Sequence, residues 1–224
     1  YSWITNVLMR FAEVLVGKIR VGLAHVNVLA SAFFAGITGS AISDLAGLGA
    51  IEIKAMTEGG YDKRFATAVT IASSLIGPMI PPSIMMVLYG SIMQVSIAAM
   101  FLGGMVPGIF LTLLLMGAIY YFSFQEKYKF PETRKSITFK EFIDAAKKGI
   151  LALIMPVIIL GGILSGVFTA TEAAAVAVFY AFIIGFFVKR SLKISDMPKI
   201  LKTISINTSI VFMVLATASI FSWI

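Results

Sequence analysis

The sequence predicts an all-α, polytopic membrane protein whose transmembrane helices are interrupted, and three observations support this. Of 224 residues, 59% are hydrophobic and 13% are charged, with a mean hydropathy of +0.97, which is typical of a protein with several spans. The apolar runs are long and do not alternate with polar residues, as transmembrane helices require. Two of these runs are broken by Gly, Ser and Thr beside a carboxylate, at residues 35–44 and 165–173.

The basic residues lie between the apolar runs. There are 18 Lys and Arg against 11 Asp and Glu, and their position is typical of cytoplasmic loops rather than of nucleic-acid binding. We therefore expect an even number of passes between neighbouring basic segments, and no nucleic-acid partner. The chain has no Cys and one His, which excludes disulfides and thiolate chemistry. It lacks an initiator Met and stops in an apolar run, so we expect a piece of a longer protein.

Three regions are predicted along the chain. Residues 1–124 form a first transmembrane half with a turn near residues 94–96, and residues 125–148 form a polar amphipathic connector. Thr138 and Glu141 of the connector match the capping-box pattern, so Thr138 is expected to cap its helix. Residues 149–224 form the start of a second half. Residues 21–53 and 149–188 are each too long for one span of roughly 20 residues, and each contains one of the two breaks. Each break is therefore the tip of a re-entrant hairpin, the far end of a pair of spans, or an interruption within a span.

The two breaks are the candidate transport site. Backbone without helical partners is costly in hydrocarbon, so it survives where it lines a cavity or is buried in protein. Paired interruptions in two halves of a membrane protein point to a substrate site. The alternative is structural, because Gly permits close packing and Ser or Thr can bond to their own helix. The candidate substrate and ion residues in the breaks are Gly36, Thr38, Gly39, Ser40, Ser43, Asp44, Gly166, Thr169, Thr171 and Glu172.

A third feature is the proline-rich segment at residues 76–83. Three prolines this close are incompatible with a regular helix, since each lacks an N–H and obstructs the preceding turn. We expect the chain to unwind here and leave carbonyls free to face a cation or a cavity. A proline-kinked packing helix is the alternative. Pro81, Pro82 and Ser83 are therefore added to the candidate site residues.

The breaks carry the chemistry that a sodium ion requires. Sodium is a hard cation that prefers oxygen ligands, as calcium and magnesium do. Hydroxyl groups and freed carbonyls at the breaks supply them, and we expect Ser40 and Thr169 to contact the ion. Asp44 and Glu172 either cap a new helix or contact the ion directly. Free N–H groups at the same breaks suit an anionic substrate.

Several of these motifs, in this order, resemble the large membrane (permease) subunit, of DctM type, of tripartite ATP-independent periplasmic (TRAP) transporters. The resemblance covers nearly the whole chain. It rests on residues 22–31, 35–44, 59–62, 76–83 and 161–173.

The resemblance implies a sodium-driven secondary transporter that imports small organic acids such as C4-dicarboxylates or sialic acids. It also implies inverted repeats, an elevator-type movement, and two partners, a small TRAP membrane subunit and a periplasmic substrate-binding protein. The expected location is a bacterial or archaeal cytoplasmic (inner) membrane, where the chain is multi-pass, with sodium as coupling ion and no other cofactor. The alternative function is a non-transporting membrane scaffold. An enzyme is not expected, since one His and no Cys leave little for acid–base or nucleophilic work.

Overall fold

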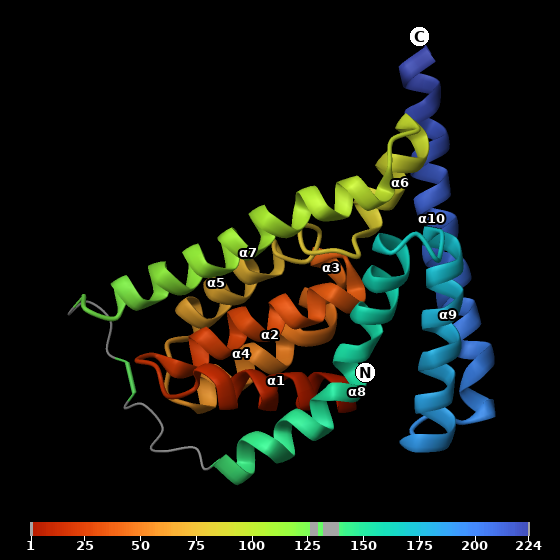
Figure 1. The fold of residues 1–224 in the computed structure, drawn as a ribbon. Coiled ribbons are helices and arrows are strands. Elements are labelled where there is room, and N and C mark those ends of the chain that lie inside the picture. The colour runs from red at the N-terminus through yellow and green to blue at the C-terminus, as the bar shows by residue number, and fades with distance from the viewer. Residues whose placement is uncertain (1, 126–129, 132–138, 224) are drawn as a thin grey trace. The chain divides into compact units, whose positions relative to one another are not determined.

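A computed structural model describes residues 2–125, 130–131 and 139–223, and every regular element in these ranges is helical (Figure 1). This confirms the all-α prediction. The α-helices are α1 (Ser2–Val16), α2 (Gly22–Thr38), α3 (Ala41–Asp44), α4 (Ala50–Glu58), α5 (Lys63–Ser74), α6 (Ile84–Met93), α7 (Ile97–Phe122), α8 (Phe139–Leu164), α9 (Ala170–Ile183) and α10 (Met197–Trp223). Short π-helical segments, Leu45–Gly49 and Ile184–Val188, follow α3 and α9, and a 3₁₀ turn, Ile194–Asp196, precedes α10.

Four helical segments in the described ranges are long and apolar enough to cross a membrane. Their mean hydropathies range from 1.6 to 2.1, and a bilayer core needs about 20 apolar residues per helix. They are Ile97–Phe122, Lys140–Leu164, Ala170–Val188 and Ile194–Thr217. These segments confirm the prediction of a polytopic membrane protein.

The chain divides into two compact units, Tyr1–Ala177 and Val178–Ile224. In the first unit α2 is the central helix, and it packs against α1, α4, α5, α7 and α8. One side of α2 contributes Val26, Ala30 and Phe34 to an apolar cluster with α1. Another side contributes Ala24 and Val28 to a cluster with α5 and α7. Because α2 is buried on several sides, its polar residues need partners within the protein.

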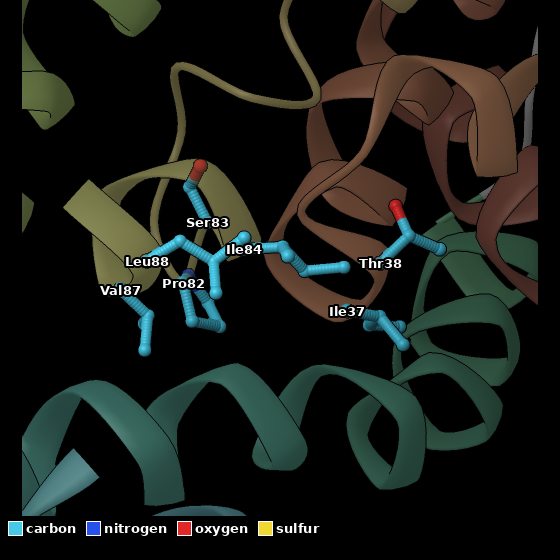
Figure 2. A pocket seen from close by; sticks show the side chains of 7 residues that line it. All are labelled: Ile37, Thr38, Pro82, Ser83, Ile84, Val87 and Leu88. Atoms are coloured by element: carbon cyan, nitrogen blue, oxygen red, sulfur yellow. The ribbon is translucent and has the colours of Figure 1, made fainter. Parts of the chain in front are cut away.

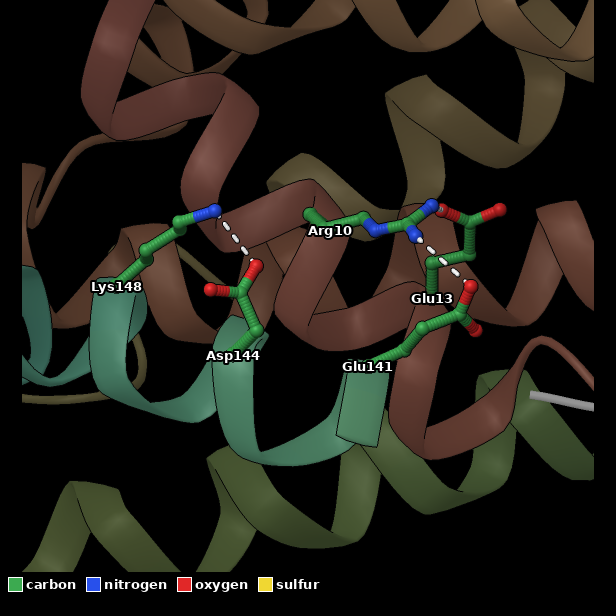
Figure 3. A network of polar contacts seen from close by, with 5 residues as sticks. All are labelled: Arg10, Glu13, Glu141, Asp144 and Lys148. Atoms are coloured by element: carbon green, nitrogen blue, oxygen red, sulfur yellow. Dashed lines mark hydrogen bonds and ion pairs between the residues drawn. The ribbon is translucent and has the colours of Figure 1, made fainter. Parts of the chain in front are cut away.

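Helix α8 packs along α1 and joins it through charged side chains (Figure 3). Arg10 of α1 lies 3.0 Å from Glu13 on its own helix and 3.9 Å from Glu141 of α8. Lys148 and Asp144 form a further pair at 2.6 Å one turn apart on α8. Except for Glu13, whose side chain is 15% exposed, these side chains are about half exposed or more, so each pair contributes little, about 0–1 kcal/mol. The contact between Arg10 and Glu141 places the first turn of α8 beside the middle of α1.

The turn expected near residues 94–96 separates α6 from α7. Gln94 is left-handed with φ 56°, and Ser96 caps α7 by accepting a hydrogen bond from Ala99 N at 3.2 Å. The predicted capping Thr138 of the connector lies outside the described residues. From Phe139 the helix continues through residue 148 to Leu164 without interruption.

The second unit contains the end of α9, the segment 184–193 and α10. The helix ends where the Gly185 carbonyl accepts hydrogen bonds from Ser191 N and Leu192 N, at 2.9 and 3.2 Å. The carboxylate of Asp196 then accepts a hydrogen bond from Lys193 N at 3.0 Å, which caps the turn before α10. The segment between α9 and α10 also carries Lys189 and Arg190. Its position between two apolar helices agrees with the basic loops expected from the sequence.

Candidate functional site

The first break is the tip of a helical hairpin. Gly39 is left-handed with φ 59°, and its N–H donates to the Ala35 carbonyl at 2.9 Å, which ends α2. Ser40 is extended, and its hydroxyl accepts a weak hydrogen bond of 3.4 Å from Ser43 N. The chain then returns along α2 through α3 and α4. At the other end of the hairpin, a Cβ on Gly59 would stand 2.4 Å from Leu23 Cδ1.

The proline-rich segment packs onto this tip. Residues 75–83 leave the helical conformation between α5 and α6, as the three prolines predict. The N–H of Ile84 donates to the Gly39 carbonyl at 3.4 Å. A Cβ at Gly39 would stand 2.4 Å from the Pro82 oxygen, and one at Gly77 would stand 2.7 Å from Asp44 Oδ2. The two glycines therefore permit a contact that any side chain would prevent.

Asp44 is buried where the tip and the proline-rich segment meet. Its side chain is 2% exposed, and the Thr38 hydroxyl donates to its Oδ1. Within the described residues, Asp44 Oδ2 and the buried Ser83 hydroxyl have no hydrogen-bond partner. Ser40 caps α3 instead of Asp44, so the capping alternative does not describe Asp44. A buried carboxylate at membrane depth is costly unless a proton or a cation accompanies it.

A pocket of about 240 Å³ opens beside this contact (Figure 2). Ile37 and Thr38 lie on its hairpin side, and residues of α6 and the segment before it lie on the other side. Its lining is Ile37, Thr38, Pro82, Ser83, Ile84, Val87 and Leu88. The pocket is mainly apolar with the hydroxyl-bearing Thr38 and Ser83 in its wall, a composition that is typical of small-molecule sites.

The second break joins two helices that are each long enough to span a membrane. Gly166 is left-handed with φ 74°, and Phe168 N donates to the Gly162 carbonyl at 2.9 Å. Both the N–H and the hydroxyl of Thr169 donate to Glu172 Oε2 at 2.8 Å, and Glu172 N donates back to the Thr169 hydroxyl at 3.3 Å. This is a capping box. Glu172 therefore has the structural role of a helix cap, and its side chain is exposed.

The structure thus brings together part of the predicted site. Thr38, Gly39, Ser40, Asp44, Pro82 and Ser83 converge at the hairpin tip, and Pro81 is buried beside them. Gly36 lies on α2 where a Cβ would stand 3.1 Å from Pro156 Cγ of α8. Ser43 and Thr171 are exposed. The contacts described for Thr169 and Glu172 are with each other, while their neighbour Phe168 packs in an apolar cluster with Val87, a residue of the pocket wall.

The structure also shows buried polar residues outside the predicted site. Asn27 and Ser31 lie one turn apart on α2, Glu52 lies on α4, and Thr70 and Ser73 lie on α5, all at most 2% exposed. The sequence carried a signal for them, because polar residues at spacings of three or four recur on one helix face. Among the described residues, no group of three His, Cys, Asp or Glu side chains is arranged to hold a metal ion. A cation bound by the described residues would therefore need hydroxyl or carbonyl oxygens in addition to any carboxylate.

Comparison with known proteins gives a consistent result. Residues 2–224 match the family model described as tripartite ATP-independent periplasmic transporter, DctM component. The chain is 40% identical over 221 residues to a sialic acid TRAP transporter large permease protein of Vibrio cholerae, covering 99% of this chain and 51% of the relative. It is 38% identical over 215 residues to a C4-dicarboxylate TRAP transporter large permease protein of Pseudomonas aeruginosa, covering 96% and 50%. An ectoine TRAP transporter large permease protein of Halomonas elongata is 37% identical over 219 residues, covering 98% and 51%.

Proposed function

Since this chain belongs to the DctM component family of tripartite ATP-independent periplasmic transporters, we propose that it forms part of the permease subunit of a sodium-coupled importer of small organic anions. The named relatives are permease proteins of transporters and not enzymes. The chain spans about half the length of these relatives. The sialic acid and C4-dicarboxylate in their names suggest a small carboxylate as substrate. In this proposal the chain lies in the inner membrane and works with a small TRAP membrane subunit and a periplasmic binding protein.

The observation that carries the proposal is the meeting of the hairpin tip with the proline-rich segment. Two stretches of non-helical backbone, residues 39–40 and 75–83, touch each other next to a buried carboxyl group and a pocket. Non-helical backbone of this kind at membrane depth is found where it lines a substrate or ion site. A scaffold needs packing surfaces but has no need for these features.

Sodium is proposed to bind at the hairpin tip and at the second break. Within the described residues, the Ser40 hydroxyl takes part in a single hydrogen bond, which it accepts from Ser43 N at 3.4 Å, so its oxygen has a lone pair available to a cation. The Thr38 hydroxyl and the Asp44 carboxyl lie on the same tip, and their oxygens suit a hard cation. Thr169 is the corresponding residue at the second break, although its hydroxyl already donates to Glu172. We also propose that an elevator-type movement carries the site, with its bound substrate, across the membrane.

The experiment that tests it is uptake by the full-length permease, reconstituted into vesicles with its small subunit and binding protein. An inward sodium gradient should drive uptake of one member of a panel of sialic acid, C4-dicarboxylates and other small carboxylates. Thr38→Val and Ser40→Ala should raise the sodium concentration for half-maximal uptake several-fold. Thr67→Val is the matched control, because the Thr67 hydroxyl bonds to the Lys63 carbonyl of its own helix, at 2.8 Å, and to no other described residue.

Two results would count against the proposal. If uptake by the wild-type complex does not depend on the sodium gradient, the proposed sodium coupling is contradicted. No uptake of any panel member, with all subunits assembled, would favour the scaffold alternative.

A further inference from the structure

A chain of buried polar side chains crosses the first unit away from the pocket. We call it the polar seam, and it consists of Asn27, Ser31, Glu52, Thr70 and Ser73. It joins α2, α4 and α5, which are packed against one another. All its side chains are at most 2% exposed, so their hydrogen bonds must be satisfied within the protein.

The direction of the hydrogen bonds in the seam follows from the shortest contact. Asn27 Nδ2 donates to Thr70 Oγ1 at 2.7 Å, which turns Asn27 Oδ1 toward Ser73. The Ser73 hydroxyl lies 2.9 Å from that oxygen and 3.0 Å from the Thr70 carbonyl oxygen, and its single proton is directed to these two acceptors. The Ser31 hydroxyl lies 3.0 Å from Ser73 Oγ and donates to it in turn. Each serine has one hydroxyl proton, so both are now used.

Glu52 closes the other end of this chain. The distance from its Oε1 to the Ser31 hydroxyl is 3.4 Å, which is longer than the 3.0 Å between the Ser31 hydroxyl and Ser73 Oγ. With the Ser31 proton directed to Ser73, the Ser31 oxygen has only lone pairs to offer to Glu52. A hydrogen bond between them then requires a proton on the carboxyl group of Glu52. An ionised carboxylate would face the Ser31 lone pairs without a donor.

The charges around Glu52 give a second, independent argument. The described part of the chain forms no ion pair with Glu52. On its own helix, Lys54 pairs with Glu58 at 3.8 Å, and both side chains are more than two-thirds exposed. On α5, Lys63 and Arg64 are exposed at the first turn. Asp44, before the π-helical segment, carries the same sign of charge and acts electrostatically on Glu52. The one titratable side chain of α2, that of His25, is buried.

We propose that Glu52 is a proton-binding site, whose protonated carboxyl group donates to Ser31 and completes the polar seam between α2, α4 and α5. This proton site is distinct from the sodium site proposed at the hairpin tip. It needs no cavity, because the proton lies within the hydrogen bond between Glu52 and Ser31. A buried carboxylate without a cation is strongly unfavourable, whereas a neutral, hydrogen-bonded carboxyl group is not. The proton therefore holds α2 and α4, the two arms of the hairpin, against α5.

Infrared difference spectroscopy on the full-length permease in detergent tests this directly. A protonated carboxylic acid has a C=O stretching band that a carboxylate lacks. The spectrum of wild type minus Glu52→Gln should contain this band at neutral pH. Glu58→Gln is the matched control, because Glu58 lies on the same helix but is exposed, and its difference spectrum should lack the band. A wild-type minus Glu52→Gln spectrum with carboxylate bands alone would overturn the proposal.

Three further measurements cover the other outcomes. If Glu52→Gln does not fold, Ser31→Ala should shift the carboxylic acid band to higher frequency, because the hydrogen-bond acceptor of the Glu52 carboxyl group is lost. An unchanged band would overturn the proposal.

Replacing sodium by choline should leave the band unchanged. A band that appears only without sodium would assign a metal cation to Glu52 instead. Where rising pH removes the band, the melting temperature of wild type should fall, and that of Glu52→Gln should not.

Discussion

Gly39 lies so close to Pro82 that a Cβ on Gly39 would stand 2.4 Å from the Pro82 carbonyl oxygen. The two residues are 43 positions apart in the chain and belong to different non-helical stretches. Gly39 is also left-handed, with φ 59°. The position therefore excludes side chains for two separate reasons, one from backbone conformation and one from contact with another segment.

The first prediction follows from this contact. Gly39→Ala should destabilise the permease by at least ~1–2 kcal/mol, the cost of a left-handed non-glycine residue, and should also push the tip away from Pro82. Uptake per folded molecule should fall sharply. Gly103→Ala is the control, because no atom lies within 4 Å of its Cβ position. Thermal unfolding in detergent, measured beside uptake, checks both. Equal stability of the two variants would contradict the close contact.

The second prediction concerns Pro81 and Pro82. Replacing both with Ala restores two N–H donors and removes steric obstacles that cost ~3 kcal/mol or more in helix interiors. The segment before α6 should become more helical, and the protein should fold at least as well. Uptake should nevertheless fall, because carbonyls of this segment would be bonded within a helix. Circular dichroism and uptake normalised to folded protein are the measurements; full uptake per folded molecule would refute a role in the site.

The third prediction separates charge from capping at Glu172. Gln can accept the same hydrogen bonds in a capping box, so Glu172→Gln should keep most of the thermal stability. Glu172→Ala removes the acceptor of the Thr169 N–H and hydroxyl and should lower the melting temperature. If transport needs only the cap, uptake should follow the same order. Loss of uptake in the Gln variant at normal stability would instead show that the negative charge itself is required.

The fourth prediction concerns topology. The charged start of α8 is expected on the cytoplasmic side, and the turn before α7 is expected on the other side, because α7 has 26 residues and is about 39 Å long. Residues 1–224 contain no natural Cys, and the same protein without an introduced cysteine measures any background labelling. Lys147→Cys should resist a membrane-impermeant thiol reagent in intact cells and react after permeabilisation. Val95→Cys should react in intact cells. The reverse pattern would invert the orientation.

Much of the local structure was determined by the sequence alone. The apolar runs predicted helices, since only a helix satisfies its own backbone in hydrocarbon. The prolines at 78, 81 and 82 predicted the unwound segment, because proline cannot donate a hydrogen bond and obstructs the preceding turn. The Gly-containing breaks and the turn at residues 94–96 also lie where the pattern placed them. All these features depend on residues that are neighbours in the chain.

The tertiary structure decided which of these features meet. From the sequence, Asp44 and Glu172 had the same two alternative roles, yet Glu172 caps α9 and Asp44 is buried against Thr38 and Gly77. The difference arises because the proline-rich segment packs onto the first break. The polar seam likewise joins residues 21 to 46 positions apart, and it exists because α2, α4 and α5 turn their polar faces toward one another. Helix periodicity defines such faces, but the packing of one helix against another selects their partners.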